Sequence, residues 1–486
     1  MTIFPQRLER TEILTSGAFW PASSRKTALS LPTPVPHLPA LVYWFFLLFI
    51  LTLPLEAANV GITSGSLSLA RLSGLMFFAT YVFYYNFLSR KRSFPRLPRA
   101  MWGFAGYLVV FALHAFFIPD ELATTFFSRL LTLIQLTAFC WIATDLLKDP
   151  RVTRHALLAY SSASVVLALG MLLELPGFYA EAIDRSERMT VMGLNPNTLA
   201  VLMAIAIIML IGLRLNSVFR HFMSKTLLVT MTLPLLLVLV RTGSRTGIGI
   251  LAIGVLVYML PQRRAKRGPT SMVLAVLVLG VLGYMASNSS VASRLGDALE
   301  GRTGRERIFA TSFEMIEERP LLGWRPIVFW YELGERLGEV GGTRDAHNLY
   351  LHLLLEVGVV GAVPFLIGLY LCGGAAWKGR EGNLGLLPIA LLLAVLAANM
   401  SHTDLERKPV WLTFAIAIAA GSQRVKKQEQ QQFNIPSMNR SFPRRSLPVS
   451  VGEGYAGVLR REQDEKIIAK LTAISRRWGT AHPLHI

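Results

Sequence analysis

The chain has 486 residues, of which 52% are hydrophobic and only 16% are charged, and its formal net charge is +19. Soluble proteins carry about 25% charged residues, so this apolar surplus must face lipid and the chain is expected to be a multi-span membrane protein rather than a soluble, disordered, collagen-like or disulfide-stabilised one. In a soluble protein the basic excess would indicate nucleic acid, but here it is typical of cytoplasmic loops held against anionic lipid, so no nucleic-acid partner is expected.

The chain opens with a polar, proline-rich segment, residues 1–38, which we expect in the cytoplasm. A membrane domain follows over residues 39–421. A hydrocarbon core of about 30 Å needs about 20 apolar helical residues, and the sequence offers about twelve such runs. The predicted fold class is therefore all-α, a polytopic bundle of about twelve transmembrane helices. The runs lie near 39–55, 66–88, 100–118, 127–147, 155–175, 193–213, 225–240, 246–260, 270–287, 348–376, 384–401 and 409–421.

The charges of the loops set the predicted orientation. Loops after even-numbered runs are basic, such as Arg90-Lys91-Arg92, whereas loops after odd-numbered runs are poor in lysine and often acidic. The positive-inside rule then puts both termini in the cytoplasm. The segments 176–192, 241–245 and 288–347 fall on the outer side, and the last is the only long outer loop. A loop of this length is usually functional.

The end of the chain, residues 422–486, is expected to be a basic cytoplasmic tail. Ile467, Leu471, Ile474 and Trp478 share one helical face among lysines and arginines, which indicates an amphipathic helix on the inner leaflet. A disordered solubilising tail is the alternative, and neither carries catalysis.

Arg241 and Arg245 flank the short outer turn between the seventh and eighth runs. Each could be an interfacial arginine whose head group reaches the water, or one of a pair lining a polar cavity. Guanidinium stays protonated and grips phosphate bidentately, so a site for a lipid-linked diphosphate would use it. Arg188, in the outer segment 176–192, is a further candidate for substrate binding.

The long outer loop contains Gly304-Arg305-Glu306-Arg307, followed by Phe309, Phe313 and Ile316. The spacing i, i+4, i+7 predicts a short amphipathic helix that ends at Pro320. Arg305 begins this helix and could face the cavity, with Arg307 as a second binding candidate. The alternative is a solvated Arg305 paired with Glu306 or Glu314.

The loop ends in Asp345, His347 and Asn348, where the tenth run begins. A lone histidine is more often structural, but imidazole at the outer mouth of a helix can take a proton from a hydroxyl. Asp345 could orient that ring. His352 is a weaker candidate inside the run, while His114 and His402 are expected to be structural.

The sixth run begins at Gly193-Leu194-Asn195-Pro196-Asn197. Asn-Pro is a turn and helix-start signal, although Asn195 and Asn197 could also bind sugar hydroxyls. The sequence holds no Cys/His cluster with metal-ligand spacing, no outer Asp-x-Asp and no Walker A loop. It therefore predicts neither a cofactor nor a metal-dependent transferase.

In order, these motifs resemble those of the bacterial O-antigen ligase and polymerase family, over about residues 190–400. The correspondence includes 193–197, Ser244-Arg245-Thr246-Gly247, Gly304-Arg305 with Phe309, and 318–323. Its sharpest part is His347-Asn348, nine residues, then Gly358-Val359-Val360-Gly361. Phe309 departs from the tryptophan or leucine usual in the family.

The resemblance implies a membrane glycosyltransferase of the C type in the bacterial inner membrane that needs no metal. Its donor would be a polyprenyl-diphosphate-linked glycan, and its acceptor a lipid A core, another lipid-linked glycan or a protein. By position, Arg245 and Arg305 would neutralise the diphosphate, His347 would act on the acceptor hydroxyl, and inversion is implied. Ligase and polymerase both stay open. The rival class is a lipid or polysaccharide flippase, which needs charge through a central cavity, whereas the notable Arg and His residues here cluster near the outer boundary.

Overall fold

A computed structural model describes residues 39–57, 68–88, 95–178, 180–183, 188–191, 194–215, 223–260, 280, 283, 305–339 and 341–433. The chain divides into two units, Met1–Glu429 and Gln430–Ile486. The expected N-terminal segment, most of the ninth run, loop residues 288–304 and the tail helix around Ile467–Trp478 all lie outside the described residues.

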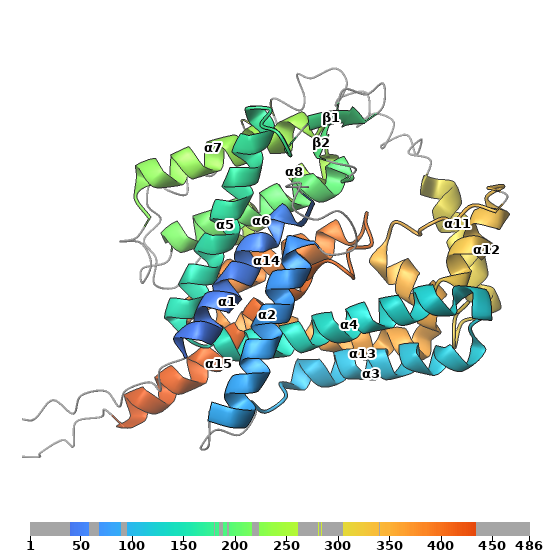
Figure 1. Cartoon of the computed structure of the whole chain (residues 1–486), viewed down its shortest axis with the longest axis horizontal. Helices are drawn as coiled ribbons and strands as arrows, with labels where there is room; N and C mark the ends of the chain where they lie inside the picture. Colours follow the sequence, from blue (N-terminus) through green and yellow to red (C-terminus); the bar gives the residue numbers. More distant parts are fainter. Residues whose placement is uncertain are drawn as a thin grey trace, which may run out of the picture. The chain divides into compact units, whose positions relative to one another are not determined.

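The described part of the chain is mostly helical (Figure 1). Apart from the ninth, every predicted run coincides with a helix, so the helical fold class is confirmed. The α-helices are α1 Ala40–Thr52, α2 Leu69–Phe83, α3 Arg99–Leu113, α4 Asp120–Leu146, α5 Pro150–Leu172, α6 Pro196–Leu215, α7 Lys225–Arg241, α8 Arg245–Met259, α11 Arg305–Glu318, α12 Val328–Arg336, α13 Leu349–Gly379, α14 Leu387–Ala398 and α15 Lys408–Phe433. Three short helices, η1 Pro54–Ala57, η2 Tyr84–Leu88 and η3 His114–Phe117, extend α1, α2 and α3.

Five described helices are long and apolar enough to cross a membrane: Arg99–Phe117, α4, α5, α6 and α13. The helices α1, α8 and α14 and the segment Lys408–Ser422 are apolar but shorter. The total of twelve spans therefore stays a prediction. By length and composition, the described residues nonetheless provide several membrane-crossing helices.

The outward face of α1 shows what this bundle is adapted to. A helix facing water carries polar residues on its outer side, but the exposed residues of α1 are large and apolar, while the opposite face is buried. An apolar exterior over an apolar core is expected where the surroundings are lipid. The exposed residues are Leu41, Trp44, Leu48 and Leu51, and the buried ones include Val42, Phe46, Phe49 and Ile50.

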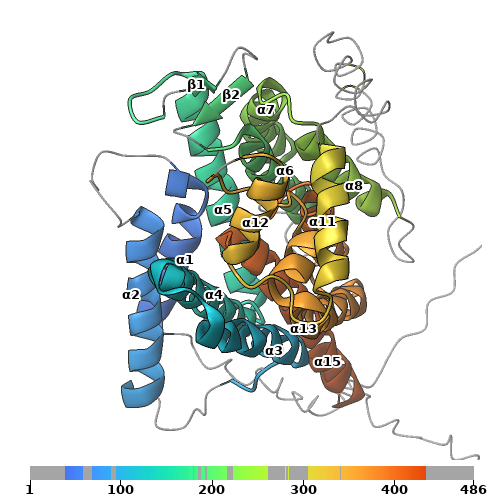
Figure 2. The same cartoon turned by 90° about the vertical axis from the view of Figure 1, so that its right-hand side faces the viewer.

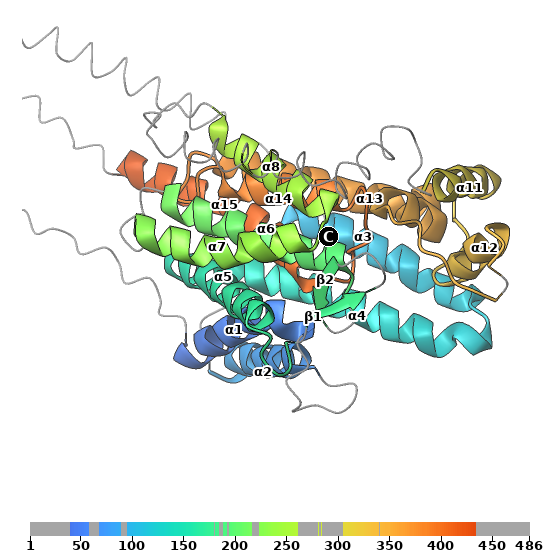
Figure 3. The same ribbon diagram turned by 90° about the horizontal axis from the view of Figure 1, so that it is seen from above.

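Close helix packing brings distant parts of the chain together. The helix α3 packs along α13, and α6 packs against α8 and α14 (Figure 3). The approach of α3 to α13 is so tight that a Cβ atom on Gly103 would lie 2.5 Å from the backbone oxygen of Pro364. Small residues allow such backbone contact between membrane helices. Figure 2 shows α1 beside α2, which are also in contact.

The helix α13 is interrupted at Gly358, whose φ of 61° and ψ of −167° are non-helical. The segment from Pro320 to Trp324 pairs with the backbone groups that the interruption releases. Trp324 N donates to Leu355 O at 2.6 Å, and Val359 N donates to Pro320 O at 2.9 Å. In a bilayer such groups must find partners within the protein, so the loop turn and the broken helix satisfy one another.

This contact explains why the sequence has glycine at both positions. A Cβ atom on Gly358 would lie 2.2 Å from Leu321 O, and one on Gly323 would lie 2.6 Å from Leu355 O. Both glycines have positive φ, which other residues rarely adopt. His114 adds a further link from α3, because its Nε2 lies 3.0 Å from Leu322 O. This contact agrees with the structural role expected for His114.

The described part of the predicted outer loop forms α11 and α12. Trp324, between them, donates its Nε1–H to Met315 O at 2.7 Å. The guanidiniums of Arg319 and Arg336 lie 4.0 and 4.8 Å from its ring centroid. Cation–π contact with one ring from two cations ties the turn to both helices. The loop is thus a folded cap that contacts α13 (Figure 2).

The segment between α5 and α6 contains a two-stranded antiparallel sheet that the sequence did not predict. Strand β1 Ala180–Ile183 pairs with β2 Arg188–Val191, and Ala180 lies opposite Val191. The strands are only four residues long. Such short strands carry too little alternation to be recognised in a charged loop.

Candidate functional site

Four helix ends meet at one place, the starts of α6, α8 and α13 and the end of α14. Ser244 Oγ donates to Asn197 Oδ1 at 2.8 Å, which links the starts of α8 and α6. Thr246 Oγ1 and Ser401 Oγ lie 2.9 Å apart, which links α8 to the residues after α14. The motifs identified in the sequence are therefore neighbours in the fold.

Arg245 is the first residue of α8 and its position is fixed by the local sequence. Ser244 is the N-cap, and its Oγ accepts a hydrogen bond from Gly247 N at 3.2 Å. A Cβ atom on Gly247 would lie 2.3 Å from the Cβ of Ala200 in α6. The Ser-Arg-Thr-Gly motif thus combines a helix cap with a close helix contact, and both place Arg245 at the junction.

Arg305 is the first residue of α11, as the sequence predicted. The buried side of this helix carries Ile308, Ser312 and Met315, which follow Arg305 at i+3, i+7 and i+10. Arg305 therefore lies on the face turned to the protein, and it is half-buried. The predicted stripe was wrong in one respect, because Phe313 is 55% exposed. The predicted positions 309, 313 and 316 and the buried positions 308, 312 and 315 have the same helical spacing, and only tertiary packing selects between them.

His347 lies just before α13 with a positive φ of 50°, an uncommon conformation for a non-glycine residue. Its side chain is 37% exposed, and its Nδ1 lies 3.6 Å from Asp345 Oδ2. The same carboxylate oxygen accepts a hydrogen bond from His347 N at 3.2 Å. Asp345 thus holds both the backbone and one side of the ring, and Nε2 is on the opposite side.

The pKa shifts of Arg305 and His347 relate the three residues expected to be catalytic. Burial and then the positive charge of Arg245 lower the pKa of Arg305. Burial also lowers the pKa of His347 from 6.5, and Asp345 opposes this while the charge of Arg305 adds to it. Arg305 therefore lies within electrostatic range of both Arg245 and His347. That the three residues form one catalytic site stays a prediction.

Other predicted binding residues lie around this site or away from it. Asn348 is the N-cap of α13; its Oδ1 accepts from Tyr350 N at 2.9 Å, and its Nδ2 donates to Met400 O at 3.2 Å. Asn195 Oδ1 accepts from Asn197 N at 2.9 Å, so the helix-start interpretation is confirmed. Contact of any of these asparagines with sugar stays a prediction.

The remaining arginines are less closely tied to the site. Arg241 is exposed at the end of α7, and Arg307 is exposed on α11. Arg188 lies in β2, where its backbone is opposite Ile183; its side chain is outside what the structure describes. None of the three is brought to Arg305 or His347 by a contact among the described residues.

Sequence reasoning missed two buried charged residues near the site, Arg129 of α4 and Glu356 of α13. They form an ion pair, and Arg129 Nη2 lies 2.9 Å from Nε2 of the buried His352. The available signal was an ionisable residue within a predicted span, which usually has a function or a partner. His402, expected to be structural, is buried close enough for its charge to lower the pKa of His347.

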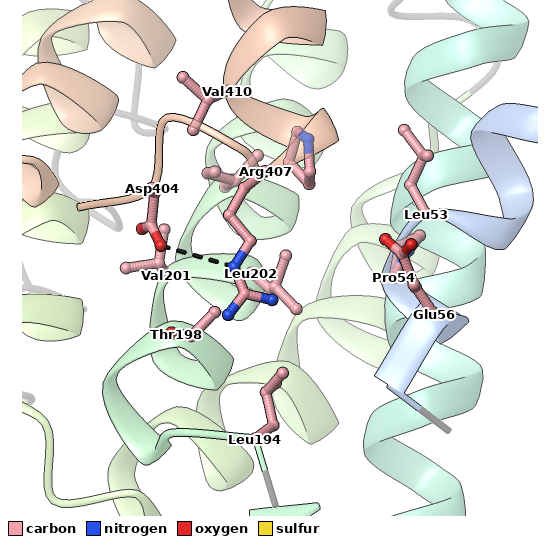
Figure 4. A pocket seen from close by; sticks show the side chains of 12 residues that line it. Leu53, Pro54, Glu56, Leu194, Thr198, Val201, Leu202, Asp404, Arg407 and Val410 are labelled. Carbon is pink, nitrogen blue, oxygen red and sulfur yellow. Dashed lines mark ion pairs between the residues drawn. The ribbon is translucent and has the colours of Figure 1, made fainter. Parts of the chain in front are cut away.

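A small cavity of about 120 Å³ lies between η1, the start of α6 and the start of α15 (Figure 4). It is lined mainly by apolar side chains of η1, α6 and α15, with charged groups at Glu56, Asp404 and Arg407. Asp404 and Arg407 form an ion pair at 3.7 Å. Asp404 also lies within electrostatic range of Asp345, although Arg245, Arg305 and His347 do not line this cavity.

Both cysteines, Cys140 and Cys372, are buried free thiols, as expected for residues that pack inside the bundle. Among the described residues, no three His, Cys, Asp or Glu side chains are grouped so as to hold a metal ion.

The fold and site define a class, namely a helical membrane protein with clustered arginines and a histidine where several helices end. Residues 227–366 match the family model described as O-antigen ligase. A protein of Pseudomonas aeruginosa named O-antigen ligase is 28% identical over 167 residues, 34% of this chain and 38% of that relative. The chain therefore matches less than half of that relative's length. The family resemblance indicated by the motifs is confirmed over residues 227–366, and the described helices suit a multi-pass membrane protein.

Proposed function

We propose that this protein transfers a polyprenyl-diphosphate-linked glycan to an acceptor hydroxyl at the outer face of the cytoplasmic membrane. The observation that carries the proposal is that Arg245, Arg305 and His347 lie at the starts of α8, α11 and α13, with Arg305 within electrostatic range of the other two. The similarity of residues 227–366 to O-antigen ligases supports it, because this segment contains all three residues.

The two arginines suit a diphosphate leaving group. A lipid diphosphate leaves readily once its developing charge is countered, and guanidinium keeps its charge at any physiological pH. Arg245 and Arg305 lie at the starts of α8 and α11, where backbone N–H groups add positive potential. Two cations that repel one another in a half-buried site are poised to bind an anion that relieves the repulsion.

His347 suits the acceptor. Its lowered pKa keeps the ring neutral near pH 7, and a neutral ring whose Nδ1–H faces Asp345 has its lone pair on Nε2. In the proposed step, Nε2 takes the proton of the acceptor hydroxyl while that oxygen bonds to the anomeric carbon. The bond from this carbon to the diphosphate oxygen breaks, and the lipid diphosphate departs with the electron pair. Direct displacement inverts the anomeric centre and needs no metal.

Ligase is preferred to polymerase because the matching family and the Pseudomonas aeruginosa relative are both named O-antigen ligase. The two differ only in the acceptor, which is a lipid or another lipid-linked glycan. A flippase would need charge along an open path through the bilayer. The buried charges of Arg129 and Glu356 are paired with one another, which favours an enzyme over a transporter.

The test is transfer by purified protein in liposomes that contain a polyprenyl-diphosphate-linked glycan and an acceptor lipid. His347→Ala and Arg245→Ala should insert normally but lose transfer, the latter by about 10²–10³-fold, as for removal of a charge-stabilising donor. Arg380→Ala is the matched control, because this arginine follows α13 at the end opposite His347. Full transfer by His347→Ala and Arg245→Ala would refute the assignment.

A further inference from the structure

A row of buried polar side chains leads from the interior of the bundle to the candidate site. Its inner part is Arg129, His352 and Glu356, whose side chains are 5%, 1% and 0% exposed. Arg129 pairs with Glu356 and with Glu406, and its Nη2 lies 2.9 Å from His352 Nε2. Tyr107 donates its hydroxyl to Glu356 at 3.0 Å.

The row ends on the carboxylate beside the proposed base. His352 Nδ1 lies 2.9 Å from Asp345 Oδ1, while Asp345 Oδ2 faces His347. A guanidinium can only donate, so Nε2 of His352 accepts from Arg129 and its proton is on Nδ1. His352 therefore donates to Asp345 and leaves the other carboxylate oxygen for His347.

The free-energy cost of burying these charged side chains indicates that the row does more than join helices. Replacing buried ion pairs by apolar residues is often neutral or stabilising, so packing of α4 against α13 would not require one. The aromatic rings of Phe111 and Trp330 lie 5.6 and 4.7 Å from the Arg129 guanidinium and shield it from solvent. The row is a chain of hydrogen bonds with desolvated inner members, and it has one end on Asp345 at the candidate site and another on the exposed Glu406.

We propose that Arg129, Glu356 and His352 are positioning residues, which hold Asp345 ionised and aligned so that His347 presents its unprotonated Nε2 to the acceptor. This inference rests on the proposed function. Arg129 fixes the His352 tautomer, His352 fixes the carboxylate, and the carboxylate fixes His347, as the orienting carboxylate does for a basic histidine.

Other charges also act on the two outer groups. His347 is influenced by Arg305 from α11, by Arg344 and Asp345 from the preceding loop, and by His402 from the segment before α15. Asp345 is influenced by His352, His347 and Asp404. Burial alone would raise the pKa of Asp345, but the hydrogen bond from His352 lowers it overall. Without the His352 donor the carboxylate is free to turn away from His347, which weakens the hold of Asp345 on that ring.

The test compares His352→Asn with His352→Leu. The asparagine amide can place an N–H near the position of Nδ1, whereas leucine keeps the volume and removes the donor. His352→Leu should lower kcat by about tenfold or more with little change in KM, as is typical when a group that orients a functional histidine through a hydrogen bond is lost. It should also move the acid limb of the kcat/KM profile to lower pH, and His352→Asn should restore both.

Leu353→Ala is the control, because Leu353 is a buried neighbour on the same helix with no polar contact. It should lower thermal stability without moving the pH profile. If His352→Leu does not accumulate, Asp345→Asn replaces it, since Asp345 lies outside the helices and the same shift is expected.

A second measurement is independent of glycan transfer. Diethyl pyrocarbonate modifies neutral imidazole, and mass spectrometry of the His347 peptide across pH gives the midpoint of its titration in the full-length protein. His352→Leu should lower this midpoint, while His352→Asn and Leu353→Ala should not. An unchanged midpoint in His352→Leu overturns the inference, whereas absence of transfer by the unmodified protein overturns the proposed function alone.

Discussion

The break in α13 at Gly358 leads to a quantitative prediction about stability. Replacing Gly358 by alanine puts a Cβ atom 2.2 Å from Leu321 O and 2.6 Å from Gly323 N, in a backbone region that costs other residues about 1–3 kcal/mol. The turn must then withdraw. Three hydrogen bonds join the turn to α13: Trp324 N of the turn donates to the helix, and Val359 N and Val360 N of the helix donate to the turn. Each contributes about 0.5–1.5 kcal/mol. We expect Gly358→Ala to destabilise the protein by about 3–7 kcal/mol.

The measurement is thermal or denaturant unfolding of the purified protein in detergent, followed by tryptophan fluorescence. Gly374→Ala is the matched control, because Gly374 lies in the same helix and a Cβ atom there meets nothing within 4 Å. That variant should be unchanged or more stable by up to about 1 kcal/mol, since alanine favours helix. Equal stability of the two variants would refute the interlocking of turn and helix.

Three further predictions concern the site. The pKa of His347 is lowered from 6.5 and the base must be neutral, so kcat/KM should be level near pH 7 and fall only as the pH approaches that lowered pKa. Arg305→Gln removes a positive charge that lowers the pKa of His347, so the acid limb of the profile should move to higher pH. An unmoved acid limb would count against the proximity of Arg305 to His347. EDTA should leave the transfer rate unchanged, and inhibition that Mg²⁺ reverses would contradict the metal-independent step. Asn348→Ala removes the cap of α13 and should lower stability by about 1 kcal/mol, whereas an unchanged unfolding midpoint would show that the cap contributes little.

Interactions between residues close in sequence allowed much of this structure to be predicted. The apolar runs predicted the helices because each must bury or expose an apolar surface in lipid, whatever its neighbours are. Asn195-Pro196 and Ser244 marked helix starts, since caps and prolines act within a few residues. Arg245, Arg305 and His347 stood out because charge beside a bilayer is expensive and is seldom retained without use.

The tertiary structure alone decided which of these groups meet and which stripe of α11 is buried. Arg129 and Glu356 are 227 positions apart, so no local pattern in the sequence shows that they pair. The Pro320–Trp324 turn and the break at Gly358 likewise read as separate motifs, although each completes the hydrogen bonds of the other. A sequence specifies periodicity and caps through contacts between near neighbours, whereas the pairing of buried charges and freed backbone groups depends on helix packing that joins distant segments.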